Sequence, residues 1–162
     1  RHDVESRGLG DVYKRQVTAR AAKAVAEAAG ADLYEIKPER PYTDADLNWM
    51  DKNSRSTLEM RDGTSRPAIA GRVENMEEYG VVFIGFPIWW YVAPRIVETF
   101  LESYDFSGKT VVPFFTSGGS GAGKTDEVLR ALCPASVQWK SAHGLNGAGA
   151  AAIKRWADGL GL

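Results

Sequence analysis

The stretch that decides the fold is VVFIGFPIWWYVAPRIVETFL, residues 81–101. It opens with Val81–Ile84, a short β-branched run of the kind that forms a strand buried on both faces. Gly85 and Pro87 then interrupt the apolar pattern. Pro94 suits the first turn of a helix, where its missing N–H is not needed. The apolar residues that follow have helical spacing, so the stretch predicts a strand, a loop and a helix.

The loop between this strand and helix carries three consecutive aromatic residues, Trp89, Trp90 and Tyr91. Such a cluster is costly to expose unless it faces a partner. In open α/β sheets, ligands bind at the loops that leave the carboxyl ends of the strands. We therefore expect a flat aromatic ligand to lie against this loop. The alternative is that either tryptophan folds back onto the core, since large aromatic side chains are readily buried.

The composition of the chain limits the classes of protein to which it can belong. The 162 residues are enough for one domain with a core, and the formal net charge of −1 gives no indication of a nucleic-acid partner. Cys133 is the only cysteine, so no intrachain disulfide can form; we assign it a structural role in a reducing compartment. No apolar run approaches the roughly 18 residues that span a membrane, and no secretory signal is evident. We expect a cytoplasmic protein with no membrane partner.

Residues 1–17, RHDVESRGLGDVYKRQV, differ from the rest of the chain. They show no period of about 2 or 3.6 residues and no core face. Within them, SRGLGDVYKRQ resembles translated sequencing-adapter sequence, and foreign segments are set aside before fold reasoning. The alternative is a genuine disordered tail. We assign residues 1–17 no function and expect residues 18–162 to form the domain.

From Thr18 onward, helical patterns alternate with short apolar strands. Thr18 is expected to cap a helix that Gly30 ends. Further strands are predicted over 31–36, 110–115 and 136–140, and further helices over 125–132 and 150–160. The alternation predicts a parallel sheet covered by helices on both faces.

Residues 37–79 read as a long polar connection with a helical turn near 44–49. Loops of this length are usually functional or disordered. Trp49 and Met50 are its main apolar side chains. We expect them to pack on the domain surface, and the alternative is that they cover a ligand.

A glycine-rich segment after the 110–115 strand matches the phosphate-loop pattern GxxxxGK[ST] through Gly118, Gly123, Lys124 and Thr125. Too little chain follows for the rest of a phosphate-loop domain, and no later strand ends in an aspartate that would hold magnesium. We therefore set nucleoside-triphosphate binding aside. Such a loop also lets backbone N–H groups approach the polar edge of a ligand.

Two separated segments, GFPIWWYVAPRIVETFLESYDFSGKTVVPFFTSGGSGAG and ADLYEIKPERPYTDADLNW, resemble the flavodoxin-like proteins. The resemblance is to a bacterial branch with PIWW and TSGGSG loops, and it covers about residues 18–162. It implies an α/β fold with a doubly wound parallel sheet in strand order 2-1-3-4-5 and one bound FMN.

The resemblance also implies which residues hold the isoalloxazine ring of FMN. They lie in the two loops: Pro87, Ile88, Trp89, Trp90, Tyr91, Thr116, Ser117, Gly118, Gly119 and Ser120. Aromatic side chains suit the flat face of a flavin, and backbone amides suit its polar edge. Because the flavin supplies the chemistry, we predict no catalytic residues and no metal ligands. His143 is interpreted as an ordinary loop residue, with a role in the site as the alternative.

The chain departs from the family pattern in two places. Tyr91 stands where many relatives have glycine, so it either adds a stacking ring or narrows the pocket. The family also begins with an apolar strand and a Ser/Thr-Gly-Asn-Thr loop that wraps the FMN phosphate. Only the last threonine of that loop aligns, with Thr18, so the resemblance implies that Thr18 is a cofactor-binding residue. We therefore expect the first strand to be missing or replaced by residues 1–17, which exposes strand edges and weakens FMN binding.

The leading interpretation is an FMN-binding electron-transfer protein of the flavodoxin-like family, and we expect loss of the phosphate loop to impair it. Its acceptor is either a redox partner protein or a small molecule. One alternative is an NAD(P)H-dependent FMN oxidoreductase acting on a quinone or similar small molecule. Another is a binding domain that keeps the fold without the cofactor. A flavin spectrum in the purified protein separates the last from the other two.

Overall fold

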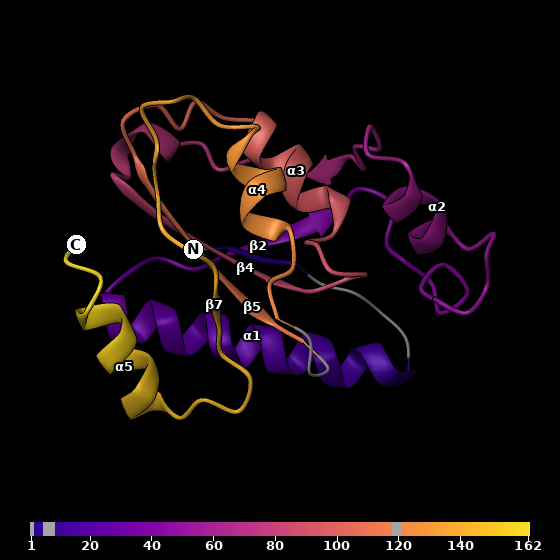
Figure 1. Cartoon of the computed structure of the whole chain (residues 1–162), viewed down its shortest axis with the longest axis horizontal. Helices are drawn as coiled ribbons and strands as arrows, with labels where there is room; N and C mark the ends of the chain where they lie inside the picture. The colour runs from indigo at the N-terminus through magenta and orange to yellow at the C-terminus, as the bar shows by residue number, and fades with distance from the viewer. Residues whose placement is uncertain (1, 5–8, 118–120) are drawn as a thin grey trace.

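A computed structural model of the protein describes residues 2–4, 9–117 and 121–162, with side chains from Val17 onward. It consists of a central sheet between two layers of helices (Figure 1). The strands are β1 (His2–Val4), β2 (Tyr34–Pro38), β3 (Ile69–Ala70), β4 (Val81–Pro87), β5 (Thr110–Thr116), β6 (Gln138–Trp139) and β7 (His143–Gly144). The helices are α1 (Leu9–Ala29), α2 (Arg55–Arg61), the 3₁₀ turn η1 (Met76–Glu78), α3 (Arg95–Glu102), α4 (Thr125–Arg130) and α5 (Ala150–Asp158).

The sheet has the strand order β3-β2-β1-β4-β5-β6, and β7 pairs with β5 farther along the same edge. Every pair is parallel except β2 with β3. Without the antiparallel β3, this order is the 2-1-3-4-5 arrangement expected from the resemblance. The predicted α/β doubly wound sheet is therefore confirmed.

The side chains of β4 alternate between the two helical layers. Val82, Ile84 and Phe86 belong to the core under α3 and α4, whereas Phe83 belongs to the core under α1 and α5. The sheet is thus buried on both faces, as its continuous apolar runs indicate. The predicted start of α3 also holds, because Pro94 immediately precedes Arg95 and has a φ of −55°.

The described part of the amino-terminal segment contains regular structure, which the alternative of a disordered tail did not predict. His2–Val4 form β1, which lies between β2 and β4, so three residues replace the expected first strand. Helix α1 begins at Leu9 and runs without a break through residue 18. Thr18 is therefore a fully buried mid-helix residue and not a helix cap. Helix extension adds one hydrogen bond per residue once a nucleus exists, which explains growth of α1 beyond its alanine-rich half.

The long connection between β2 and β4 contains more structure than its composition indicates. Hydrogen-bonded turns cover residues 44–47, near the predicted helical turn. The sequence interpretation missed α2, whose first turn is capped by the Ser54 side chain accepting from the Thr57 N–H. Among the described residues, no helix combines the length and apolar character needed to cross a bilayer.

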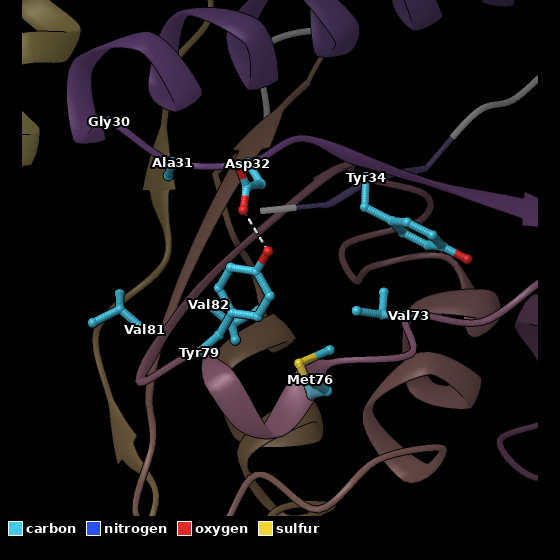
Figure 2. Close-up of a pocket in the computed structure, with 9 residues that line it drawn as sticks. All are labelled: Gly30, Ala31, Asp32, Tyr34, Val73, Met76, Tyr79, Val81 and Val82. Carbon is cyan, nitrogen blue, oxygen red and sulfur yellow. Dashed lines mark hydrogen bonds between the residues drawn. The ribbon is translucent and has the colours of Figure 1, made fainter.

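A cavity of about 200 Å³ lies at the amino end of the sheet, where β1 is short (Figure 2). The turn at 30–32 and Tyr34 line one side, and Val81 and Val82 of β4 line the other. Both valines pair with β5 on their far edge. Between described residues, the pairing of β1 with β4 is confined to His2 and Ile84. The cavity therefore lies beside the edge of Val81 and Val82 that does not pair with β5.

We predict that adding Val-Ile-Val ahead of residue 1 stabilises the fold, because the added residues would extend β1 and bury apolar surface beside Val81 and Val82. A gain of about 1 kcal/mol corresponds to a rise of about 2–4 °C in melting temperature for a chain of this size. Calorimetry of the extended and original chains measures the rise in melting temperature. A Gly-Ser-Gly extension is the matched control, and equal melting temperatures for the two extensions would contradict the prediction.

Candidate functional site

The two predicted loops leave neighbouring strands at the same end of the sheet. Pro87 ends β4 and Thr116 ends β5, and these two residues are partners in the parallel register. The Ile88 N–H donates to the Thr116 carbonyl oxygen at 2.9 Å, so pairing continues one residue beyond β4. The structure therefore brings Pro87 and Ile88 next to Thr116, and residues 89–91 follow directly. The predicted residues Gly118, Gly119 and Ser120 lie outside the described part of the chain.

Residues 89–92 form a tight turn that presents two aromatic side chains to solvent. Trp89 and Val92 exchange backbone hydrogen bonds of 2.8 and 3.2 Å. Between them, Trp90 and Tyr91 have φ angles of 46° and 70°. This left-handed region costs a residue with a side chain about 1–2 kcal/mol. The two side chains are 39% and 69% exposed, and strained backbone that displays apolar rings is a feature of ligand sites.

Trp89 faces the other way, toward the connection between β2 and β3. Its half-buried ring packs edge-on against Tyr42, with ring centroids 5.8 Å apart and an interplanar angle of 84°. The guanidinium of Arg55 lies 3.8 Å from the Tyr42 ring centroid, and the Tyr42 hydroxyl donates to the Glu59 carboxylate. Burial and then this hydrogen bond raise the pKa of Tyr42 above its ordinary value. Trp89 thus turns inward, whereas Trp90 remains at the surface.

Gly123 joins the glycine-rich loop to the tryptophan turn. A Cβ at this position would lie 2.2 Å from the Tyr91 carbonyl oxygen, and the backbone φ is +58°. The Lys124 N–H donates to the same oxygen at 3.2 Å. The Thr125 hydroxyl is buried and donates to the Ala122 carbonyl at 2.6 Å. Gly123, Lys124 and Thr125 of the phosphate-loop pattern therefore make packing contacts within the protein. This agrees with the interpretation that the loop does not bind a nucleoside triphosphate.

Two side-chain contacts fix the base of the glycine-rich loop. The hydroxyl oxygens of Thr116 and Thr18 are 2.5 Å apart, and both residues are buried, so β5 is tied to α1. The Asn146 amide holds Ser117: its Oδ1 accepts from the Ser117 N–H at 2.9 Å, and its Nδ2 donates to the Ser117 carbonyl. Sequence reasoning missed Asn146, whose only signal was its place in a late glycine-rich loop.

The remaining candidates come from other segments of the chain. Burial raises the pKa of the Cys133 thiol, and its Sγ lies 3.7 Å from the Leu129 carbonyl, which agrees with a structural role. His143 stacks on Trp156, with centroids 4.9 Å apart and planes at 10°. Trp49 and Met50 are 66% and 75% exposed, so the expected packing on the domain surface is wrong.

Comparison with known proteins gives a consistent result. The sequence profile of the flavodoxin family matches residues 12–160. A provisionally assigned flavoprotein from Bacteroides eggerthii is 46% identical, with a TM-score of 0.87 over 99% of this chain and 97% of that one. A second from Bacteroides uniformis is 45% identical, with a TM-score of 0.86 over 97% and 95%.

A solved structure with much lower sequence identity shares the fold. A flavoprotein from Lactobacillus acidophilus, solved in complex with FMN, is 16% identical with a TM-score of 0.64, over 90% of this chain and 93% of that one. A comparison with curated protein sequences finds no match.

We predict that Gly123→Ala destabilises the protein by about 2–4 kcal/mol, because its Cβ would overlap the Tyr91 carbonyl and its φ would become strained. Denaturant unfolding measures the change. Gly121→Ala is the matched control, since a Cβ there meets no atom within 4 Å. Equal stabilities for the two variants would show that the contact with Tyr91 is not tight.

We also predict that Tyr91→Gly is more stable than Tyr91→Ala by about 1 kcal/mol. Both variants remove the ring, but only glycine relieves a φ of 70°. The difference in unfolding free energy between the two variants isolates the backbone strain. A Tyr91→Ala variant as stable as Tyr91→Gly would mean that the turn is unstrained.

Proposed function

Since the chain belongs to the flavodoxin family, we propose that it binds FMN at the 87–91 and 116–120 loops and transfers electrons through it. The observation that carries this proposal is the aromatic turn at 89–92. It lies at the carboxyl ends of two parallel strands, beside a glycine-rich loop, and holds two exposed rings on strained backbone. The fold shared with a flavoprotein solved with FMN supports the same assignment.

The residues present fit a flavin. Its tricyclic ring needs an apolar, flat-walled site, and Trp90 and Tyr91 offer exposed aromatic faces there. Its polar edge needs hydrogen-bonding groups, and we assign that role to the main chain of the glycine-rich loop. Asn146 occupies both main-chain groups of Ser117 and so anchors the base of this loop. Such a fixed site binds without first ordering the loop base, which favours affinity.

FMN supplies the redox chemistry when it is bound. The chain's own residues bind and orient it. The aromatic side chains exclude water from the ring face, and a drier surrounding strengthens each polar contact at the ring edge. Thr18 and Thr116 hold α1 against the end of β5, so they position the glycine-rich loop without needing to react.

The acceptor in this proposal is a redox partner protein or a small molecule, and the single cysteine suits work in the reducing cytoplasm. A second candidate function is NAD(P)H-dependent reduction of a small molecule. It is favoured by an apolar cleft on the inner flank of the aromatic turn, lined by Trp49, Trp89 and Trp90. Steady NAD(P)H oxidation that requires an added quinone would select it over transfer to a protein.

We predict that replacing Trp89 and Trp90 together with alanine weakens FMN binding by about 1–3 kcal/mol, from lost stacking and buried area. Quenching of FMN fluorescence during titration measures the affinity. Trp89 also packs against Tyr42, so its loss could affect folding. Circular dichroism of the variant checks that it is folded.

Leu33→Ala is the control, because it removes an exposed apolar side chain that lies outside the two loops and outside the cleft beside them. A folded double variant with the original affinity would remove the aromatic turn from the cofactor site. Purified protein that neither contains flavin nor takes up added FMN would favour the cofactor-free binding domain.

A further inference from the structure

The cavity at the amino end of the sheet lies at the opposite end of β4 from the loops assigned to FMN. Val81 begins β4 and lines the cavity, whereas Pro87 ends the strand about 20 Å farther along. The side chains of Met76 and Val82, 5% and 2% exposed, form an apolar wall (Figure 2). With a volume of about 200 Å³, the cavity has room for a ligand the size of one ring with a short side chain.

Asp32 places a carboxylate at this cavity. Among the described residues that line the cavity, it is the one with a charged side chain. Its oxygen Oδ2 accepts a hydrogen bond from the Tyr79 hydroxyl (Figure 2). Its other oxygen, Oδ1, accepts no hydrogen bond from the part of the chain that the structure describes, and no ion pair forms there. Tyr79 therefore fixes the carboxylate and leaves one oxygen to accept from a ligand.

Main-chain acceptors also face this region. The Thr110 N–H donates to the Gly80 carbonyl at 2.9 Å, so that carbonyl points toward β5. Successive carbonyls of a strand point to opposite edges, so the Val81 carbonyl points toward the side of β1. Next to it, α1 ends at Ala29 with no basic residue in its last turn, and the carbonyl end of a helix carries partial negative charge. These groups favour a ligand that donates hydrogen bonds and carries positive charge.

The charged groups beside the cavity do not reverse this preference. The buried ammonium of Lys109 donates to the main-chain carbonyls of Met76 and Tyr79, so these acceptors already compensate its charge. Glu77 and Glu78 of η1 are exposed on the same segment and add negative charge on this side of the molecule. A cation that approaches the cavity therefore meets a favourable electrostatic surrounding.

We propose that this cavity binds a small primary amine whose apolar body is about the size of one aromatic ring. The ammonium group donates to Asp32 Oδ1 and to the Val81 carbonyl, and the apolar body packs against Met76 and Val82. The site shares no residue with the two loops assigned to FMN. Binding of the amine therefore does not rest on the proposed function.

Calorimetric titration of the full chain with phenethylamine, without FMN, tests the proposal. We expect measurable binding. Asp32→Asn should weaken it by about tenfold, because the amide keeps the shape of the side chain but loses its charge. Asp44→Asn is the matched control, since Asp44 is an exposed aspartate outside the cavity, and it should leave the affinity unchanged. Phenylacetate, an anion with a similar apolar body, should bind at least about tenfold more weakly than phenethylamine.

A second variant tests the apolar part of the site. Val73 is a half-buried residue of the lining, so the larger ring of Val73→Phe should fill the cavity and abolish binding of phenethylamine (Figure 2). Circular dichroism checks that this variant is folded. Should it fail to fold, the comparison of Asp32→Asn with Asp44→Asn still decides the proposal.

Four outcomes would overturn the proposal: no binding of phenethylamine, unchanged affinity in Asp32→Asn, equal affinity for phenylacetate, or unchanged binding to folded Val73→Phe. The first would identify the cavity as a packing gap beside the short β1. Failure of the proposed function has a different signature, in which FMN does not bind while phenethylamine still binds and still depends on Asp32.

Discussion

The parallel pairing of β4 with β5 is the interaction on which the candidate site depends. Seven consecutive residues of each strand are in register, from Val81 with Thr110 to Pro87 with Thr116. Because both strands end at the same level, the loops that follow must begin side by side. The pairing is secured from both faces, since the apolar side chains of β4 alternate between two helical cores. A backbone ladder inside the core thus determines which surface loops meet.

The tryptophan turn is strained, and contacts on both of its flanks hold it. On one flank, Gly123 and Lys124 approach the Tyr91 carbonyl; on the other, Trp89 packs on Tyr42. Neither Trp90 nor Tyr91 favours a positive φ, so the surrounding packing must impose it. This arrangement explains how two aromatic side chains remain exposed at defined positions. It also gives the turn two usable sides, one toward the glycine-rich loop and one toward α2.

The connection between β2 and β3 packs against one flank of the aromatic turn. A surface helix as short as α2 has little stability of its own, so the buried Tyr42 and the guanidinium groups of Arg55 and Arg95 matter to it. These contacts turn a long polar connection into a fixed wall beside the aromatic turn. The wall and residues 88–90 of the turn together line an apolar cleft.

The sequence by itself determined the α/β class, the strands β4 and β5, the start of α3 after Pro94 and the two loops that follow the strands. Continuous apolar runs and helical spacing are local patterns that report burial directly. Tertiary structure alone decided the start of α1, the existence of α2, the positive φ of Tyr91 and the contact between Asn146 and Ser117, 29 residues apart. Each of these features depends on contacts between segments that are far apart in the sequence. A local sequence pattern does not indicate which distant segment will pack against it.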